Sequence, residues 1–171
     1  SAEWHQEAER RGLKGIKNAP DAFKEYITPK TLKLFDSVGV MTAREAQARY
    51  EVLNETFVKK LQIEARVLGD MITNHVIPTA FSFQNTLITN VKGIKELFPA
   101  EYETMCSTQL SLIHKISGYV NRLHTLVEEM VDARRVANKI EDIPSRAEAY
   151  NATVFPYMAK IREIADKLEM Y

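Results

Sequence analysis

The chain has 171 residues and is formally neutral at pH 7, because 23 Lys and Arg balance 23 Asp and Glu. This balance gives no net field that would favour nucleic acid or an anionic membrane, and one cysteine excludes an intrachain disulfide. No apolar run approaches the roughly 18 residues of a membrane-spanning helix. We therefore expect a cytoplasmic protein without nucleic-acid or membrane partners.

Short helices are predicted over residues 1–40. Gly12 ends the first of them, and Asn18 and Thr28 are good caps for the next two, each followed within two residues by a proline. Gly39 ends the last one.

A very long helix is predicted over residues 42–91. Thr42 and Glu45 have the spacing of a capping box, which satisfies the first free N–H groups of a helix. The apolar residues that follow recur every three or four positions and form one stripe: Ala46, Tyr50, Leu53, Phe57, Leu61, Ala65, Leu68, Ile72, Val76, Ala80, Phe83 and Leu87. Pro78 has no N–H for the carbonyl of Asn74, so we expect a kink there and not a stop.

A second apolar stripe in the same helix contains Ile63, Val67, Met71, Ile77 and Phe81. It lies on a different face from the first stripe, so the pattern predicts that the middle of the helix is covered on two sides, by the bundle and by the N-terminal segments. On this prediction Met71→Asp would bury an unpaired carboxylate and cost several kcal/mol, on the order of 2–5 kcal/mol.

Two more long helices are predicted, over residues 99–139 and 144–170. Lys92-Gly93 is read as the break before the first of them, and the second is a near-perfect heptad pattern interrupted by Pro156. Cys106 falls on an apolar stripe and is expected to be an inert core residue. The predicted fold is all-α, a single helical domain over residues 1–171. It is an elongated antiparallel bundle of three long helices plus short N-terminal helices.

Helix lengths predict an uncovered end of this bundle. If the second long helix runs back along the first, Lys139 lies beside roughly residue 50, and the last helix climbs roughly 39 Å to the level of Pro78. Beyond that level two helices have no third partner, although this end is rich in apolar side chains: Phe81, Phe83, Leu87, Ile88, Leu97, Phe98 and Met105. An apolar patch of this kind usually marks an interface, so we expect a subunit or domain contact.

No catalytic, cofactor-binding or metal-ligating residue is identified. No two histidines are three or four residues apart, and the lone cysteine has no companion for a zinc site. His124 and Glu128 are spaced i,i+4, which fits a base and its orienting group but fits a surface pair better. Arg134-Arg135 is too isolated, and too balanced by acidic neighbours, to bind nucleic acid.

Several segments resemble one family, the type III glutamine synthetases, in the region after their catalytic core. The opening E-W-H-Q-E-A-E-R-R-G-L is similar to the family's E-W-x-x-E-A-x-R-R-G-L. Further matching segments are spread along the chain: Pro20-Asp21-Ala22, Leu34-Phe35, Arg49-Tyr50-Glu51, Ile63-Glu64-Ala65, Asp70-Met71, Ile77-Pro78 and Ala165-Asp166-Lys167-Leu168-Glu169. One departure is Gly69, where a larger residue is usual in the family.

The resemblance implies a C-terminal fragment that supplies packing and subunit contacts in a ring-built dodecamer. The parent enzyme would ligate ammonia to glutamate with ATP, using Mg or Mn held by residues upstream of this chain, so no cofactor is expected in the chain itself. Its partners would be the catalytic core of its own chain and neighbouring subunits. The alternative is a free-standing helical-bundle interaction module, and a bundle enzyme with a buried site is a third hypothesis.

Overall fold

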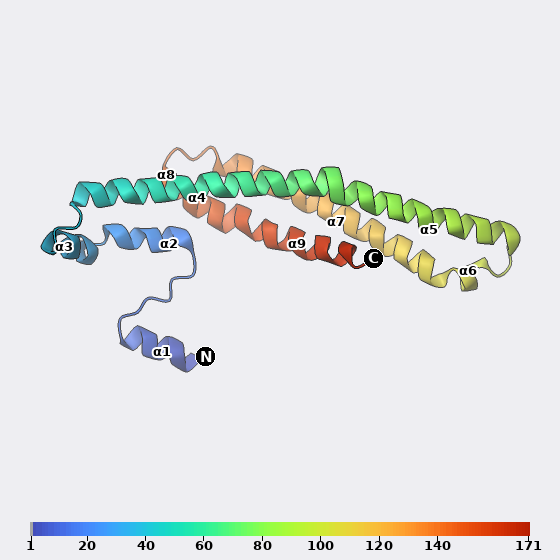
Figure 1. The fold of residues 1–171 in the computed structure, drawn as a ribbon, viewed down its shortest axis with the longest axis horizontal. Helices are drawn as coiled ribbons and strands as arrows, with labels where there is room; N and C mark the ends of the chain where they lie inside the picture. Colours follow the sequence, from blue (N-terminus) through green and yellow to red (C-terminus); the bar gives the residue numbers. More distant parts are fainter. Residues whose placement is uncertain (1) are drawn as a thin grey trace.

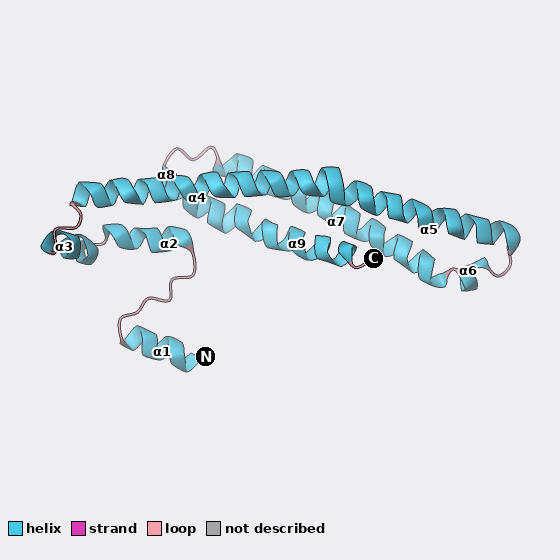
Figure 2. Cartoon of the chain, in the orientation of Figure 1, coloured by secondary structure: helices cyan, strands magenta, loops and turns pink. Residues whose placement is uncertain are grey.

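A computed structural model describes residues 2–171; Ser1, the first residue of the predicted domain, lies outside the described residues. Every regular element in the described part is helical and none is a strand, which confirms the all-α class. The longest helical rod runs the whole length of the molecule, and two shorter ones lie along it (Figures 1 and 2).

The N-terminal elements have the predicted caps and ends. Their bounds are Ala2–Arg10 for α1, Ala19–Lys24 for α2, Glu25–Ile27 for the short 3₁₀ turn η1 and Pro29–Ser37 for α3. The side chain of Asn18 accepts a hydrogen bond from the N–H of Asp21 in the first turn of α2, and that of Thr28 accepts one from the N–H of Thr31 in the first turn of α3. Gly12 and Gly39 have positive φ, the conformation that glycine adopts most easily at a helix end.

The long helix comprises 55 residues. It consists of α4 (Ala43–Met71), a π-helical turn η2 (Ile72–Val76) and α5 (Ile77–Leu97). Both bonds of the Thr42–Glu45 capping box are present. The predicted break at Lys92-Gly93 is wrong, because the helix continues through Gly93 to Leu97. A glycine inside a helix costs only about 1 kcal/mol, which the buried neighbour Val91 offsets by packing.

The two interior prolines are accommodated by wide turns. Pro78 cannot donate to the carbonyl of Asn74, and the helix widens into η2 just before it, so α5 leaves at an angle to α4 (Figure 1). Pro156 has the same effect in the last helix, which consists of α8 (Ile143–Ala149), the π turn η3 (Tyr150–Val154) and α9 (Phe155–Glu169).

The second long helix starts later than predicted. Pro99 lies in a turn in which the carbonyl of Phe98 accepts the N–H groups of Glu101 and Tyr102, and only the four-residue α6 (Tyr102–Met105) follows. Cys106, fully buried as predicted, separates α6 from α7 (Ser107–Ala137). The prediction that Pro99 opens a continuous helix is therefore wrong, because the chain first uses these residues to reverse direction.

Side-chain hydrogen bonds fix how α7 lies along the long helix. Gln62 donates to Asn138 at 2.6 Å and Gln84 donates to Ser117 at 2.6 Å. The end of α7 is thus near residue 62 and not near residue 50, a shift of about three turns. This shift in register arises because the long helix is longer than predicted and because α7 begins later than predicted.

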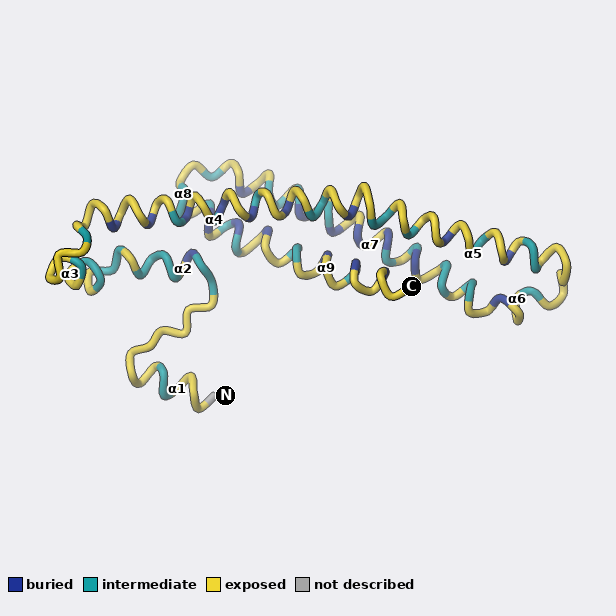
Figure 3. Tube along the Cα trace, in the orientation of Figure 1, coloured by how far each residue is buried: buried dark blue, intermediate teal, exposed yellow. Residues whose placement is uncertain are grey.

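The core lies where the long helix, α7 and the last helix run side by side (Figure 3). Its fully buried side chains come from all of them: Ile72 from the long helix, Ile116, Leu123, Leu126 and Met130 from α7, and Tyr150, Val154 and Ile161 from the last helix. The N-terminal elements α2, η1 and α3 pack on the first half of α4, where Phe23 meets Phe57 edge-on with the ring centroids 6.2 Å apart. Helix α1 lies apart from the bundle at the end of an extended connector (Figure 1).

Candidate interaction surface

The apolar tip is the end of the molecule formed by the far part of α5, by α6 and by the start of α7. Helix α9 stops short of it: Leu168 and Tyr171 line a groove of about 490 Å³ together with Val76, Ala80 and Phe83. The last helix therefore reaches the level that was predicted from its length. None of the seven apolar residues predicted for the tip is buried, and Leu97 is 75% exposed.

The second apolar stripe of the long helix is also largely open, and of its five residues only Ile77 packs against the core. Ile63, Val67 and Met71 are 62%, 51% and 50% exposed, so the prediction that the bundle and the N-terminal segments cover this face is wrong. The N-terminal segments pack on the first half of α4 and on α8, and α7, α8 and α9 lie against the other faces of α4. The sequence pattern correctly identified an apolar face, but this chain does not supply what covers it.

The junction of α2, α4 and α8 is held by charge. The ammonium of Lys24 lies 2.7 Å from Glu148 and 3.0 Å from Asp21, and these hydrogen bonds raise the pKa of Lys24. Tyr50 lies in the same junction, where burial raises the pKa of its phenol. The Lys24–Glu148 pair joins α2 to α8 and is structural, whereas the Lys24–Asp21 pair lies within α2.

The residues considered for chemistry stay on the surface. His124 and Glu128 are 3.4 Å apart and both are exposed, which is the surface pairing preferred above. Arg135 pairs with Asp132 at 2.9 Å. Residues 2–171 contain no group of three or more His, Cys, Asp and Glu that could hold a metal ion. Among the described helices, none combines the length and the apolar character needed to cross a membrane.

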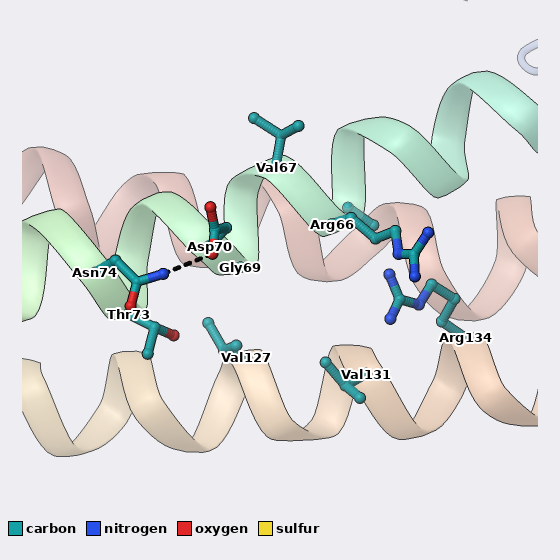
Figure 4. Close-up of a pocket in the computed structure, with 10 residues that line it drawn as sticks. Arg66, Val67, Gly69, Asp70, Thr73, Asn74, Val127, Val131 and Arg134 are labelled. Atoms are coloured by element: carbon teal, nitrogen blue, oxygen red, sulfur yellow. Dashed lines mark hydrogen bonds between the residues drawn. The ribbon is translucent and has the colours of Figure 1, made fainter.

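One arrangement of polar side chains was not predicted from the sequence. Arg66 from α4 and Arg134 from α7 point toward each other at the rim of a shallow groove (Figure 4). Arg134 was considered only together with Arg135 as a possible nucleic-acid contact, and Arg66 was not considered. The pair could have been predicted only from the correct register of α7 on α4. The predicted helix ends gave a register about three turns from the observed one.

Comparisons with known proteins agree on one family. Residues 1–95 match the sequence profile of the glutamine synthetase C-terminal domain. The chain is 42% identical over 171 residues to a glutamine synthetase of Bacteroides fragilis (strain YCH46), and 26% identical over 170 residues to a type-3 glutamine synthetase of Dictyostelium discoideum. A glutamine synthetase of Butyrivibrio fibrisolvens is 25% identical over 167 residues. These alignments cover 98–99% of this chain but only 23–24% of each relative, so the chain spans about a quarter of their length.

Proposed function

Because this chain belongs to the glutamine synthetase C-terminal domain family, we propose that it is a non-catalytic structural and assembly domain of a type III glutamine synthetase. The parent protein would act in cytoplasmic nitrogen metabolism and ligate ammonia to glutamate at the expense of ATP. The ATP and the Mg or Mn ions would be held by parts of the parent outside this chain. The partners of the domain would be the catalytic core of its own chain and neighbouring subunits.

The observation that carries this proposal is the exposure of the apolar tip. Two helices meet there without a third, and Phe81, Leu97, Phe98 and Met105 are all exposed. A patch of this kind is rare on a protein that works alone and is typical of an interface. The open stripe of α4 adds a second uncovered face, so the chain has more apolar surface than its own elements can pack.

A free-standing interaction module would also expose apolar surface. The similarity favours the first proposal, because three relatives align with nearly the whole chain and each is named a glutamine synthetase. Each is also about four times longer, which leaves ample protein to cover the exposed faces.

Sedimentation velocity of the 171-residue chain tests the assembly role of the tip. We expect weak, concentration-dependent self-association, which the double substitution Leu97→Glu with Met105→Glu abolishes. Both side chains are exposed, so the melting temperature should change by only a few degrees, about 3 °C or less. Leu87 is unsuitable for this test, because it is half-buried and packs against the core.

Val136→Glu is the matched control. Val136 is 65% exposed and lies near the other end of α7, so this substitution adds the same charge away from the tip and should leave the association unchanged. A wild-type chain that stays monomeric at high concentration would contradict the proposal, as would equal loss of association in the control.

A further inference from the structure

The groups around Arg66 and Arg134 form a pocket that is almost entirely made of hydrogen-bond donors. A concavity of about 180 Å³ is lined by Gln62, Arg66, Arg134, Arg135 and Asn138. Neither Arg66 nor Arg134 forms an ion pair or a hydrogen bond with any side chain of residues 2–171. Their two guanidinium groups reach across from α4 and α7 toward each other (Figure 4).

Ordinary surface behaviour does not account for this arrangement. Two cations on flexible side chains are free to turn away from each other into solvent, and like charges repel. The position of Arg134 and Arg135 in the last turn of α7 suits the partial negative charge of a helix C-terminus. That explanation does not extend to Arg66, because the long helix continues beyond α4 through η2 and α5 to Leu97 and has no C-terminus near Arg66.

Two carboxylates on the same helices as these arginines are bonded to other side chains. Asp70 lies one turn beyond Arg66 and accepts a hydrogen bond from Asn74 at 2.5 Å. Asp132 is paired with Arg135. The pocket therefore keeps two positive charges, those of Arg66 and Arg134, that no carboxylate of the described chain neutralises.

The neutral side of the pocket adds a free donor from Asn138 beside the Oε1 acceptor of Gln62, whose Nε2 is the bonded group. The Oδ1 atom of Asn138 accepts both Nε2 of Gln62 at 2.6 Å and the hydroxyl of the buried Tyr150 at 2.7 Å. Both lone pairs of this oxygen are thus used, and the Nδ2 amino group of Asn138 remains as a free donor. Because Tyr150 is fully buried, this network also fixes the position of Asn138 at the end of α7.

We propose that this pocket binds a phosphate dianion, either inorganic phosphate or the phosphate of a small monoester, between α4 and α7. Two unpaired guanidinium groups match the charge of a dianion, whereas a single carboxylate would leave one of them uncompensated. The bound anion would join the long helix to α7 close to the start of α8. This site is independent of the proposed assembly role, and either can fail without the other.

Thermal melting of the 171-residue chain provides the first test, in sodium phosphate and in sodium chloride at equal ionic strength. A ligand that binds only the folded chain raises its melting temperature. We expect phosphate to raise it by about 2 °C or more above the value in chloride. Arg66→Gln and Arg134→Gln should lose that increment, and Arg122→Gln, which removes a solitary exposed arginine of α7, should keep it.

The comparison between variants separates binding from the general stabilising effect of phosphate salts, which acts on all of them alike. In chloride, Arg66→Gln should be at least as stable as wild type, because it removes one of two facing cations. An increment that survives in both Arg66→Gln and Arg134→Gln would overturn the proposal.

Calorimetric titration with inorganic phosphate and with glycerol 3-phosphate identifies the source of the phosphate. Binding of either, weakened about tenfold or more by Arg66→Gln, supports the site, and the tighter of the two identifies the ligand class. Binding of neither at 10 mM, about ten times a dissociation constant of 1 mM, would overturn it.

Discussion

Two adjacent residues of the long helix provide a direct test of which face the chain buries. Ile72 is 2% exposed in the core, whereas half of the Met71 side chain is open to solvent. Replacing each of them by aspartate introduces the same carboxylate into the same turn of the helix. The two variants therefore differ mainly in the surroundings of that carboxylate.

The expected magnitudes follow from burial. Ile72→Asp removes a fully buried side chain worth about 1.5–3 kcal/mol and places an unpaired carboxylate among apolar groups. We expect a loss of about 4 kcal/mol or more. Met71→Asp keeps its carboxylate in water and should cost about 1 kcal/mol or less, mainly through the lower helix propensity of aspartate.

Thermal melting followed by circular dichroism measures the difference. For a chain of this size about 1 kcal/mol shifts the melting temperature by roughly 2–4 °C, so Ile72→Asp should lower it by about 10 °C or more and Met71→Asp by a few degrees. Equal, large losses in both variants would refute the reasoning, because they would mean that the open face of α4 is covered within the chain.

Two further predictions concern the same helix. Gly69→Ala should raise the melting temperature by about 2–4 °C, because alanine favours the helix by about 1 kcal/mol. The added Cβ would lie at an ordinary contact distance, 3.5 Å from Val127. A lower melting temperature would mean that α4 and α7 approach more closely than the structure indicates. Thr42→Ala should lower the melting temperature by about 2–4 °C near pH 7, because it removes a helix cap. Hydrogen bonds from Thr42 lower the pKa of Glu45 in the folded chain. The carboxylate of Glu45 therefore contributes to folding stability above its unfolded-state pKa, and this contribution is lost as the pH falls through the lower folded-state pKa. The gap between wild type and Thr42→Ala should therefore narrow in melts below about pH 4, and a gap that stays constant in acid would contradict the role of the carboxylate.

Local signals in the sequence were sufficient to predict the elements and their capped starts, but not the helix ends on either side of the turn between α5 and α7. Thr42, Asn18 and Thr28 cap the helices they were expected to cap, because a capping side chain bonds only to neighbours in sequence. Gly93 was misread as a break because glycine is only weakly unfavourable in a helix, and packing on either side of it decides the outcome. Pro99 was misread as a helix start because a proline suits a turn as well as a first helical position.

These small errors in helix ends had a large effect on the site. The position of the turn between two antiparallel helices decides which residues of one helix face which residues of the other. An error in the position of the turn therefore changes every facing pair along the interface. The facing of Arg66 and Arg134 depends on that register, and no pattern within either helix indicates it. The apolar tip was predictable, in contrast, because it depends on helix lengths and on where the last helix runs out.

The uncovered surfaces of this chain differ in chemistry and so in the kind of partner they can accept. The tip and the open stripe of α4 are apolar and can be covered only by another protein surface, because no small ligand buries two such separated faces. The pocket between Arg66 and Arg134 is small and cationic, and a single anion can fill it. A neighbouring subunit at the tip would fix the far end of the long helix, and an anion at the pocket would fix its middle to α7. Assembly and anion binding can thus act on the same 55-residue helix at two separate places, and substitutions at one place should leave the other unchanged.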